Sequence, residues 1–437
     1  MEITVDFTKE CGKIKQMHCV NNGPVGNGVR GKGFSNGHLF KEAGIPYARL
    51  HDSAFYSGYG GEYSVDVHRI FPDFDADVND PTSYVFAPTD KYLKDIDASG
   101  TKIFYRLGAA IEHGYKRGTY PPKDTIKWCH ICEHIIMHYT QGWANGFNYD
   151  IEYWEIWNEP DCRNADGSNP CWQGTEEEFA EFFATSVKYL KEKFPKLKIG
   201  GPAMMYIWGP EYNKLIFDTL KEKGVTLDFY SFHKYGNIPS QFVADVEAAY
   251  ALLSDYDCND KTELVLNEWN YVRGWMDEKW VHTRYAEKGM KGAAFIAGVM
   301  SVCQYTKLDK LMYYDARPCG MNGMFDTDFF TPLKGYYPFV MFNNLYRLKN
   351  AVAASGDTDE VYAVAAKNGN ESGILVTYFS DNDNAVDGEI LLDIKNGSSK
   401  YEMYLLDGDH DNELVGTVSA GQTITLKPQS VVYLKSI

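Results

Sequence analysis

Two glutamates lie at or near the ends of apolar segments of the sequence. Glu159 directly follows the segment YWEIWN (153–158), and Glu268 lies near the end of ELVLNEW (263–269). A carboxylate beside a buried strand is costly unless it is hydrogen-bonded or takes part in chemistry. Two carboxyl groups that share one site can divide the roles of proton donor and nucleophile. The alternative is that each glutamate caps a neighbouring helix or pairs with Arg49.

An alternation of elements along the chain would carry these glutamates. Short apolar segments with strand character alternate with amphipathic helical segments. The expected strands are 17–21, 47–51, 102–108, 153–158, 197–201, 228–233, 263–269 and 311–315. Eight strands, each followed by a helix over about 330 residues, predict an α/β fold of the (β/α)8 TIM barrel type. A doubly wound sheet fits less well because it usually needs fewer such units.

The carboxyl ends of the strands form the active site in barrels of this kind. Both glutamates are expected there, one from the fourth strand and one from the seventh. The other chemistry-bearing residues at predicted strand ends are Asn21, Arg49, His51, Asn158, His233, Tyr235, Trp269, Tyr314 and Asp315. Two carboxylates in one layer with arginine, histidine and tyrosine between them favour a catalytic site over two independent helix caps.

The C-terminal part of the chain has a different pattern. After about residue 347, apolar and polar residues alternate at period two, with NG and DG turns between the segments. This predicts a small antiparallel β-sandwich, which the opening EITVDFT is expected to join. We therefore expect a catalytic barrel over 10–347 and an accessory sandwich made of 1–9 and 348–437. The long segment 52–87 is expected to cover the catalytic face.

Composition limits the possible partners and location. The chain has 437 residues, a net charge of −17 and a pI near 5.1, which argues against nucleic acid. No apolar run has the length of a membrane span. The N-terminus lacks the apolar core of a signal peptide and the 9 cysteines are scattered, so a cytoplasmic location is expected unless a leader has been removed from a secreted protein. Cys162 and Cys171 could pair in an oxidising compartment, but no disulfide is expected.

The residues singled out above resemble the motifs of a known family. WNEP (157–160) and the glutamate of LNEW (266–269) resemble the clan A glycoside hydrolases, which are retaining (β/α)8-barrel enzymes. RLH (49–51), HKY (233–235) and the C-terminal sandwich look most like family 39, the β-xylosidase and α-L-iduronidase family. The segment YYDARPCGMNGMFD (313–326) departs from the loop expected of a β-xylosidase, as does the long segment after the second strand. Both departures concern the sugar pocket, so they put the substrate in question.

The resemblance implies that Glu159 is the general acid/base and Glu268 the nucleophile of a double displacement. Such an enzyme needs its two carboxyl groups about 5–5.5 Å apart. The acid must stay protonated near neutral pH, and an apolar setting from Trp154 and Trp157 would help to raise its pKa.

The remaining strand-end residues would hold the nucleophile or the sugar. Arg49 and Tyr235 would keep the nucleophile ionised through an opposite charge and a hydrogen bond, and Asn158 would contact the sugar 2-hydroxyl. The further residues expected to bind substrate are His51, His233, Trp269, Tyr314 and Asp315. Trp269 and Tyr314 are candidate stacking walls, and the alternative for each is a packed core aromatic.

The function implied by the resemblance is a retaining O-glycosidase that removes a terminal, xylose-like sugar from an oligosaccharide or another glycoside. Exo action is inferred from segment 52–87, which would close one end of the cleft. The alternatives are another family 39 specificity (arabinosidase, galactosidase, glucosidase or iduronidase), an endo-acting relative, or an inactive carbohydrate-binding barrel. No cofactor is expected, because two carboxyl groups and water complete the reaction. No metal is expected either, since His130, His134 and His138 are interpreted as one face of an amphipathic helix. The sequence does not indicate an oligomeric state.

Overall fold

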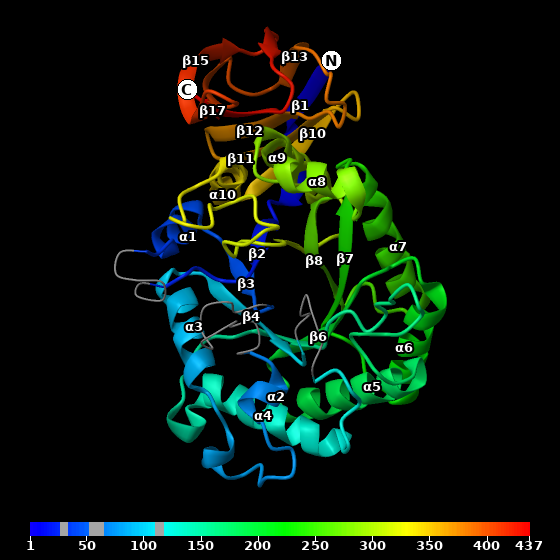
Figure 1. Ribbon diagram of the computed structural model, residues 1–437. Helices are drawn as coiled ribbons and strands as arrows, with labels where there is room; N and C mark the ends of the chain where they lie inside the picture. Colours follow the sequence, from blue (N-terminus) through cyan, green and yellow to red (C-terminus); the bar gives the residue numbers. More distant parts are fainter. Residues whose placement is uncertain (27–33, 52–64, 110–117) are drawn as a thin grey trace.

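The computed structural model describes residues 1–26, 34–51, 65–109 and 118–437. Its centre is a closed barrel of eight strands that follow one another in chain order (Figure 1). The barrel strands are β2 (Gln16–Asn21), β3 (Tyr47–Arg49), β4 (Lys102–Leu107), β5 (Tyr153–Ile156), β6 (Lys198–Met204), β7 (Phe229–Gly236), β8 (Glu263–Tyr271) and β9 (Lys310–Tyr313). Neighbouring strands are parallel throughout. The (β/α)8 barrel predicted from the sequence is confirmed.

Helices connect the strands and cover the outside of the barrel (Figure 1). Thr175 and Glu178 form a capping box at the start of α5, and Gly44 and Gly142 end α1 and α4 in the left-handed conformation. The α-helices are α1 (Gly37–Ala43), α2 (Val67–Ile70), α3 (Ala87–Ala98), α4 (Thr125–Gln141), α5 (Glu176–Lys193), α6 (Pro210–Glu222), α7 (Gln241–Asp255), α8 (Asp277–Ala286), α9 (Met290–Gln304) and α10 (Tyr337–Leu348). Short 3₁₀ turns occupy η1 (Pro81–Ser83), η2 (Trp143–Asn145) and η3 (Lys334–Tyr336).

The histidines of α4 take part in helix packing. His138 is buried, with Nδ1 2.8 Å from the Trp143 carbonyl and Nε2 3.1 Å from the Asp90 carboxylate. His134 Nδ1 lies 2.8 Å from the carbonyl of His130 on the same helix. These contacts agree with the interpretation of the three histidines as part of an amphipathic helix.

The barrel interior has an apolar layer below a polar one. The apolar layer consists of Cys19, Tyr47, Phe104, Tyr153, Phe229, Val265 and Met312. Residues two positions further along a strand point to the same side, and on six of these strands they are polar. One of them, Arg106 of β4, pairs with Asp66. The other five are Asn21, Arg49, Glu155, Ser231 and Asn267, and hydrogen bonds connect them to one another. The apolar layer thus fills the barrel interior next to a hydrogen-bonded layer of polar residues.

A second, nine-stranded sheet follows the order β15-β14-β17-β12-β11-β10-β1-β13-β16. Its strands are β1 (Glu2–Lys13), β10 (Asn350–Gly356), β11 (Val361–Asn368), β12 (Glu371–Tyr378), β13 (Gly388–Lys395), β14 (Lys400–Leu406), β15 (Asp411–Ser419), β16 (Thr423–Leu426) and β17 (Ser430–Ser436). Pairing is antiparallel except between β1 and β13. Strands from both ends of the order share one core, which includes Val418 and Ile424. This fits the predicted C-terminal β-sandwich, and we propose that 1–9 and 348–437 form that unit beside the barrel of 10–347.

The sandwich contacts the barrel beside the strand that carries Glu268. β11 and β12 pack on α9 and α10 (Figure 1). Asp381, which follows β12, accepts hydrogen bonds from Tyr271 (2.6 Å), Asn237 (2.7 Å) and Arg273 (2.9 Å). Because Tyr271 is the last residue of β8, the carboxyl end of that strand is tied to the sandwich.

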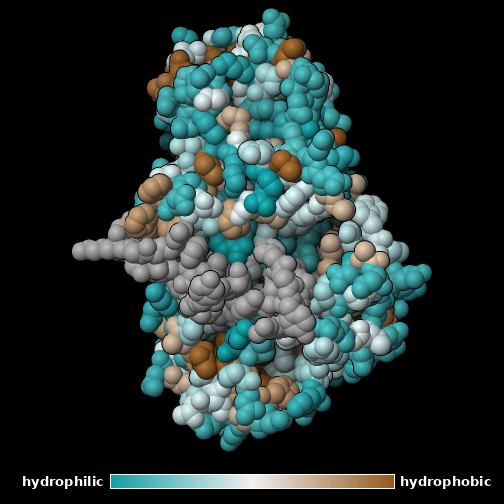
Figure 2. Space-filling view, viewed as in Figure 1, coloured by the Kyte–Doolittle hydropathy of each residue, from teal (hydrophilic) through white to brown (hydrophobic). Residues whose placement is uncertain are grey.

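The described residues on the face shown in Figure 2 form a mostly hydrophilic surface with scattered hydrophobic side chains. This agrees with the net charge of −17. Within the described ranges, no helix is long and apolar enough to cross a membrane.

Candidate active site

The carboxyl ends of β5 and β8 bring the two glutamates together. Glu159 lies just beyond β5, and Glu268 lies within β8. One carboxylate oxygen from each and a ring nitrogen of His233 lie within 4.8 Å of one another. Glu159 is 6% exposed and Glu268 is 3% exposed. Two carboxyl groups this close in a nearly buried site cannot ionise independently.

The backbone after β5 is strained where it presents Glu159. Trp157 and Glu159 have φ angles of 75° and 46°, in the left-handed region that residues other than glycine rarely adopt. The Glu159 N–H donates to the Ala203 carbonyl of β6 at 2.9 Å, which holds the turn against the next strand. Strain of this kind concentrates at functional sites.

A bulge in β8 points Glu268 into the barrel. The pairing of β7 with β8 passes from Phe232 and Leu266 to His233 and Glu268, so β8 has one extra residue, Asn267, at this point. A bulge re-aims the side chains next to it. Asn267 and Glu268 therefore both contact the inward-facing polar residues, although strict alternation would send one of them outward.

Arg49 and Tyr235 hold the two oxygens of Glu268. Arg49 Nη1 donates to Oε1 at 2.9 Å, and the Tyr235 hydroxyl donates to Oε2 at 3.0 Å. Burial raises the pKa of Glu268, and the charge of Arg49 opposes this rise. The structure thus brings to this carboxylate the two residues that the sequence assigned to it.

His233 lies between the two carboxylates. Its Nδ1 is 2.8 Å from Glu159 Oε1 and 3.5 Å from Glu268 Oε2. Burial lowers the pKa of His233 to about 4. Burial and the neighbouring charge of Arg49 also hold the pKa of His51 well below its usual value, and His51 Nε2 lies 3.6 Å from Glu268 Oε1. Both imidazoles are neutral near pH 7, so the positive charge beside Glu268 comes from Arg49.

A further buried carboxylate, Glu155 on β5, positions Arg49. Arg49 Nε donates to Glu155 Oε2 at 2.6 Å. The Oε1 atom accepts from the Ser231 hydroxyl at 2.6 Å and from Asn267 Nδ2 at 2.5 Å. The sequence analysis gave Glu155 no role. The sequence feature that could have identified Glu155 is its position two residues after the inward-facing Tyr153, because this spacing places both side chains on the same face of the strand.

The side-chain amide of Asn158 has its oxygen hydrogen-bonded and its NH₂ group available. Its Oδ1 accepts a hydrogen bond from Arg49 Nη2 at 2.6 Å, which fixes the orientation of the amide. Asn158 Nδ2 is buried and makes no hydrogen bond within the described structure. A buried donor is costly to leave unsatisfied, so this group is well placed to bind a substrate hydroxyl.

The predicted stacking role of Trp269 is wrong. Trp269 is fully buried, and its ring packs against Phe242 and Tyr313 at centroid distances of 6.0 and 5.4 Å. Successive side chains on a strand point to opposite faces. Because Glu268 points into the barrel, Trp269 points out toward the helices and belongs to the core.

The expectation that Trp154 and Trp157 surround the carboxyl of Glu159 is also wrong. The Trp154 ring stacks on Tyr105 at 4.7 Å within the core between strands and helices. The Trp157 ring packs edge-on against Trp172 at 5.1 Å. Both indoles therefore pack in the core between the barrel strands and the surrounding helices.

Tyr314 and Asp315, after β9, have different positions. The Tyr314 ring lies edge-on to His51 with centroids 5.7 Å apart, so it borders the site. The Asp315 carboxylate accepts from the Arg317 backbone and lies 3.3 Å from its guanidinium and 3.4 Å from the Cys319 thiol. These contacts of Asp315 organise the loop that follows β9.

Trp275 is a candidate site residue that the sequence analysis missed. It follows β8, is 53% exposed and lies edge-on to Tyr235 at a centroid distance of 5.1 Å. An exposed indole beside a residue that binds Glu268 is a candidate surface for a sugar ring. No spacing rule in the sequence distinguishes Trp275 from a core tryptophan.

Of the segment 52–87, which is predicted to cover the catalytic face, residues 52–64 lie outside the described residues. The described part that follows is anchored by Asp66, whose carboxylate accepts from Arg106 at 2.6 Å in a fully buried pair. Arg106 also donates to the His51 carbonyl at 3.3 Å. This part of the chain is therefore connected to the site residue His51.

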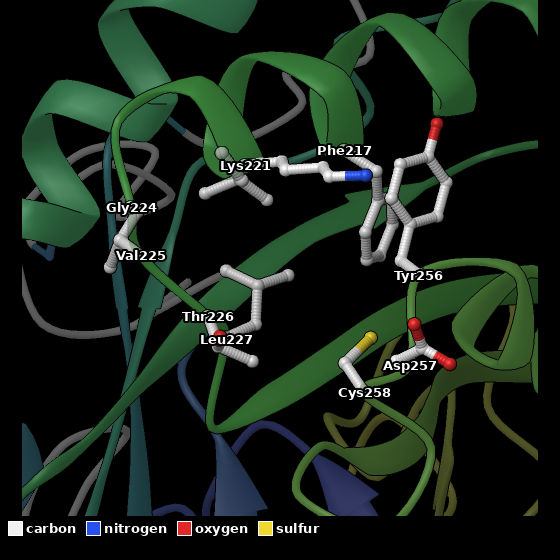
Figure 3. A pocket seen from close by; sticks show the side chains of 10 residues that line it. Phe217, Lys221, Gly224, Val225, Thr226, Leu227, Tyr256, Asp257 and Cys258 are labelled. Atoms are coloured by element: carbon white, nitrogen blue, oxygen red, sulfur yellow. The ribbon is translucent and has the colours of Figure 1, made fainter.

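A hollow of about 230 Å³, drawn in Figure 3, lies away from the carboxylates. Its lining includes Phe217 and Lys221 of α6 and Leu227 and Cys258, which precede β7 and β8. It lies at the amino ends of these strands, opposite the end that carries the chemistry in such barrels. The hollow is therefore not part of the candidate active site.

Comparison with known proteins relates part of the chain to a glycoside hydrolase family. Residues 64–278 match the model described as Glycosyl hydrolases family 39. The Beta-xylosidase of Geobacillus stearothermophilus is 25% identical over 230 residues, which are 50% of this chain and 42% of that relative. The protein is most like family 39 of the clan A glycoside hydrolases. The alignment thus spans less than half of the curated relative's length.

Solved structures share the fold of this family 39-like protein over nearly its whole length. A glucosidase from Croceicoccus marinus has a TM-score of 0.78 at 21% identity and covers 99% of this chain and 98% of its own. A monomeric beta-xylosidase from Caulobacter crescentus has a TM-score of 0.68 at 15% identity, with 99% and 98% covered. The GH39 enzyme of Xanthomonas axonopodis pv. citri also has a TM-score of 0.68 at 15% identity, with 99% and 96% covered. At these identities the likeness establishes the fold.

Proposed function

We propose that the protein is a retaining glycoside hydrolase that removes a terminal sugar, with a specificity like that of a β-xylosidase. The observation that carries the proposal is the position of Glu159 and Glu268, whose carboxylate oxygens lie within 4.8 Å of each other. Retaining enzymes place these groups about 5–5.5 Å apart, whereas inverting enzymes leave about 6.5–9.5 Å for a water molecule. The short separation supports double displacement.

In the first step, Glu268 attacks the anomeric carbon while the protonated Glu159 gives its proton to the departing glycosidic oxygen. The bond between the sugar and the leaving group breaks, and an ester between the sugar and Glu268 forms. In the second step, Glu159, now a carboxylate, takes a proton from water. The resulting hydroxide attacks the anomeric carbon and releases Glu268, which restores the starting protonation states.

The contacts of the two glutamates support this division of roles. Arg49 and Tyr235 both favour the carboxylate form of Glu268, as a nucleophile requires. Glu159 is bonded by the neutral imidazole of His233, which is compatible with a protonated carboxyl. Asn158 Nδ2 would donate to the sugar 2-hydroxyl, a contact that strengthens at the transition state.

Glutamine variants test the chemistry directly. Glu159→Gln and Glu268→Gln should each lower kcat on a nitrophenyl glycoside by at least about 10²-fold. Glu152→Gln is the control, because Glu152 lies on the same segment but pairs with Lys198 at 2.8 Å away from the cleft. Normal activity in both site variants would refute the assignment.

Azide rescue separates the two roles. A Glu268→Gly variant should regain turnover with azide and give a product of inverted configuration. A Glu159→Gly variant should give a product of retained configuration and lose least on substrates with good leaving groups. Tight sugar binding without turnover in the unaltered protein would indicate an inactive carbohydrate-binding barrel instead.

Substrate specificity is tested with a panel of nitrophenyl xylosides, arabinosides, galactosides, glucosides and uronides. The family 39 match and the curated relative favour xylosides. An arabinoside preference is the second candidate, because solved structures with this fold include alpha-L-arabinofuranosidases from Thermotoga species. Release of single sugars from oligosaccharides, without shorter oligosaccharides early in the reaction, would support exo action.

A further inference from the structure

The loop between β5 and α5 returns to the site of Glu159. Cys162 lies three residues after Glu159 in the sequence, and Cys171 lies near the end of the loop. Asn169 closes the loop: its Nδ2 donates to the Pro160 carbonyl at 2.5 Å, and its Oδ1 accepts from the Cys171 N–H at 3.0 Å. The two cysteines are thereby held beside the same carboxylate.

The three side chains form a compact cluster. The sulfur atoms of Cys162 and Cys171 and a carboxylate oxygen of Glu159 all lie within 4.8 Å of one another. Cys171 is 3% exposed, and Cys162 is partly exposed. In a tetrahedral zinc site with Zn–S distances of about 2.3 Å, two thiolates lie roughly 3.8 Å apart.

We propose that Glu159, Cys162 and Cys171 bind a thiophilic divalent cation of the Zn²⁺ class, and that the bound cation inhibits the enzyme. Two thiolates and one carboxylate supply the sulfur and oxygen ligands that Zn²⁺ accepts, and water completes the fourth position. His233 is bonded to the Oε1 atom of Glu159 at 2.8 Å. A hydrogen bond of this kind orients a carboxylate ligand.

The charge balance accounts for both binding and inhibition. Binding replaces the thiol protons of Cys162 and Cys171 and the carboxyl proton of Glu159 with one cation of charge +2, and the protons pass to solvent. Glu159 then has no proton to give to the leaving group. The inhibition rests on the proposed role of Glu159 as the acid, whereas the binding site does not depend on it.

The catalytic pair itself is a poorer cation site. Glu159, His233 and Glu268 also lie within 4.8 Å of one another. However, Arg49 already donates to Glu268 at 2.9 Å, so a second cation there would be repelled by the guanidinium. The soft sulfur ligands of the loop also discriminate in favour of Zn²⁺ over Mg²⁺ or Ca²⁺.

Co²⁺ is a spectroscopic probe for this site. Titration of the chelator-treated protein with Co²⁺ should produce a thiolate-to-metal charge-transfer band and the intense visible bands of tetrahedral Co²⁺, saturating at a single ion per chain. Cys162→Ser should abolish the charge-transfer band or weaken it severely, and Cys171→Ser is the second variant. Cys11→Ser is the matched control, because Cys11 is exposed on β1 in the other sheet.

Zn²⁺ inhibition is measured in parallel. Saturating Zn²⁺ should lower kcat/KM on an oligosaccharide, whose poor leaving group needs the proton of Glu159, by about 10²-fold or more, and EDTA should reverse this. Inhibition in each cysteine variant is referred to the metal-free activity of that variant, and it should disappear in Cys162→Ser but persist in Cys11→Ser. A charge-transfer band unchanged in both loop variants would overturn the site. A Cys162–Cys171 disulfide in the purified protein, detected by non-reducing peptide mapping, would also overturn it.

Binding and function can fail separately in this design. If Co²⁺ binds through the cysteines but Zn²⁺ leaves hydrolysis unaffected, the inhibitory proposal is refuted while the metal site stands, and the Glu159 variants decide the acid role separately. If hydrolysis is absent from the start, the Co²⁺ spectrum alone decides whether the site exists.

Discussion

Replacement of Tyr235 by phenylalanine isolates the contribution of one hydrogen bond to Glu268, the proposed nucleophile. The change removes the hydroxyl that donates to Glu268 Oε2 at 3.0 Å and leaves the ring against Trp275. Loss of a donor disfavours the carboxylate and raises the pKa of Glu268 further. Only the carboxylate can attack, so kcat/KM falls as the pH drops through this pKa. The acid limb of the Tyr235→Phe profile should therefore lie at higher pH than that of the unaltered protein.

The size of this shift follows from the strength of the bond. A hydrogen bond to a charged group contributes about 1.5–3 kcal/mol, and one pKa unit corresponds to about 1.4 kcal/mol. The acid limb should thus move by about one to two pH units. Burial already raises the pKa of Glu268. The acid limb of the unaltered protein is therefore expected at a pH above that of an ordinary glutamate, where the protein is easier to assay.

The assay is kcat/KM on a nitrophenyl glycoside as a function of pH, because this quantity reports the ionisations of the free enzyme. Tyr271→Phe is the matched control: Tyr271 lies on β8 like Glu268, but its hydroxyl donates to Asp381 of the sandwich. Its acid limb should coincide with that of the unaltered protein. An acid limb of Tyr235→Phe that stays in place or moves to lower pH, in a variant with unchanged thermal unfolding, would refute the reasoning.

Three further predictions concern stability. Glu155→Gln should lower the free energy of unfolding by about 3 kcal/mol in urea denaturation, because it removes one of the two carboxylates that pair with the buried Arg49 guanidinium. Glu152→Gln, at a pair 36% exposed on the glutamate side, should cost about 0–1 kcal/mol. Asp381→Ala should cost about 2 kcal/mol in the same measurement. It should cost more than Asp383→Ala, since the two side chains are 21% and 51% exposed. Equal losses would count against the contribution of the contacts between Asp381 and the residues at the end of β8. Burial raises the pKa of Asp161 from 3.8 to about 6. As the pH rises, Asp161 therefore loses its proton in the unfolded chain before it does so in the folded protein. The free energy of unfolding should fall by up to about 3 kcal/mol between about pH 3 and 7. An Asp161→Asn variant should lack this part of the pH dependence, and an identical profile in urea titrations would contradict it.

The barrel could be predicted because each strand carries its own apolar pattern and each helix its own caps. The strand expected at 153–158 ends at Ile156, because Trp157 and Glu159 take positive φ angles that end regular pairing. The strand expected at 228–233 continues to Gly236, which places Tyr235 within it. Such boundaries depend on neighbouring strands that a local pattern does not describe.

The site could be predicted in outline from the positions of the strand ends. Alternation alone would have corrected Trp269, since it follows an inward-facing Glu268. It would also have placed Glu155 on the inner face of its strand. The bulge at Asn267 could not be predicted in this way, because an extra residue in β8 is visible only against its pairing with β7. The inward direction of both Asn267 and Glu268 is therefore a property of the assembled sheet.

A single guanidinium connects Glu155 to Glu268 and Asn158. Arg49 donates through Nε to Glu155, through Nη1 to Glu268 and through Nη2 to Asn158. Because the guanidinium is planar and its donors are fixed relative to one another, the position of Glu155 determines where Glu268 and the Asn158 amide are held. Within this cluster one cation faces two carboxylates, and a third, Glu159, lies within 4.8 Å of Glu268. A proton is the least costly way to relieve that excess of negative charge. In the proposed mechanism it resides on Glu159, so the arrangement that keeps the nucleophile ionised also favours a protonated acid.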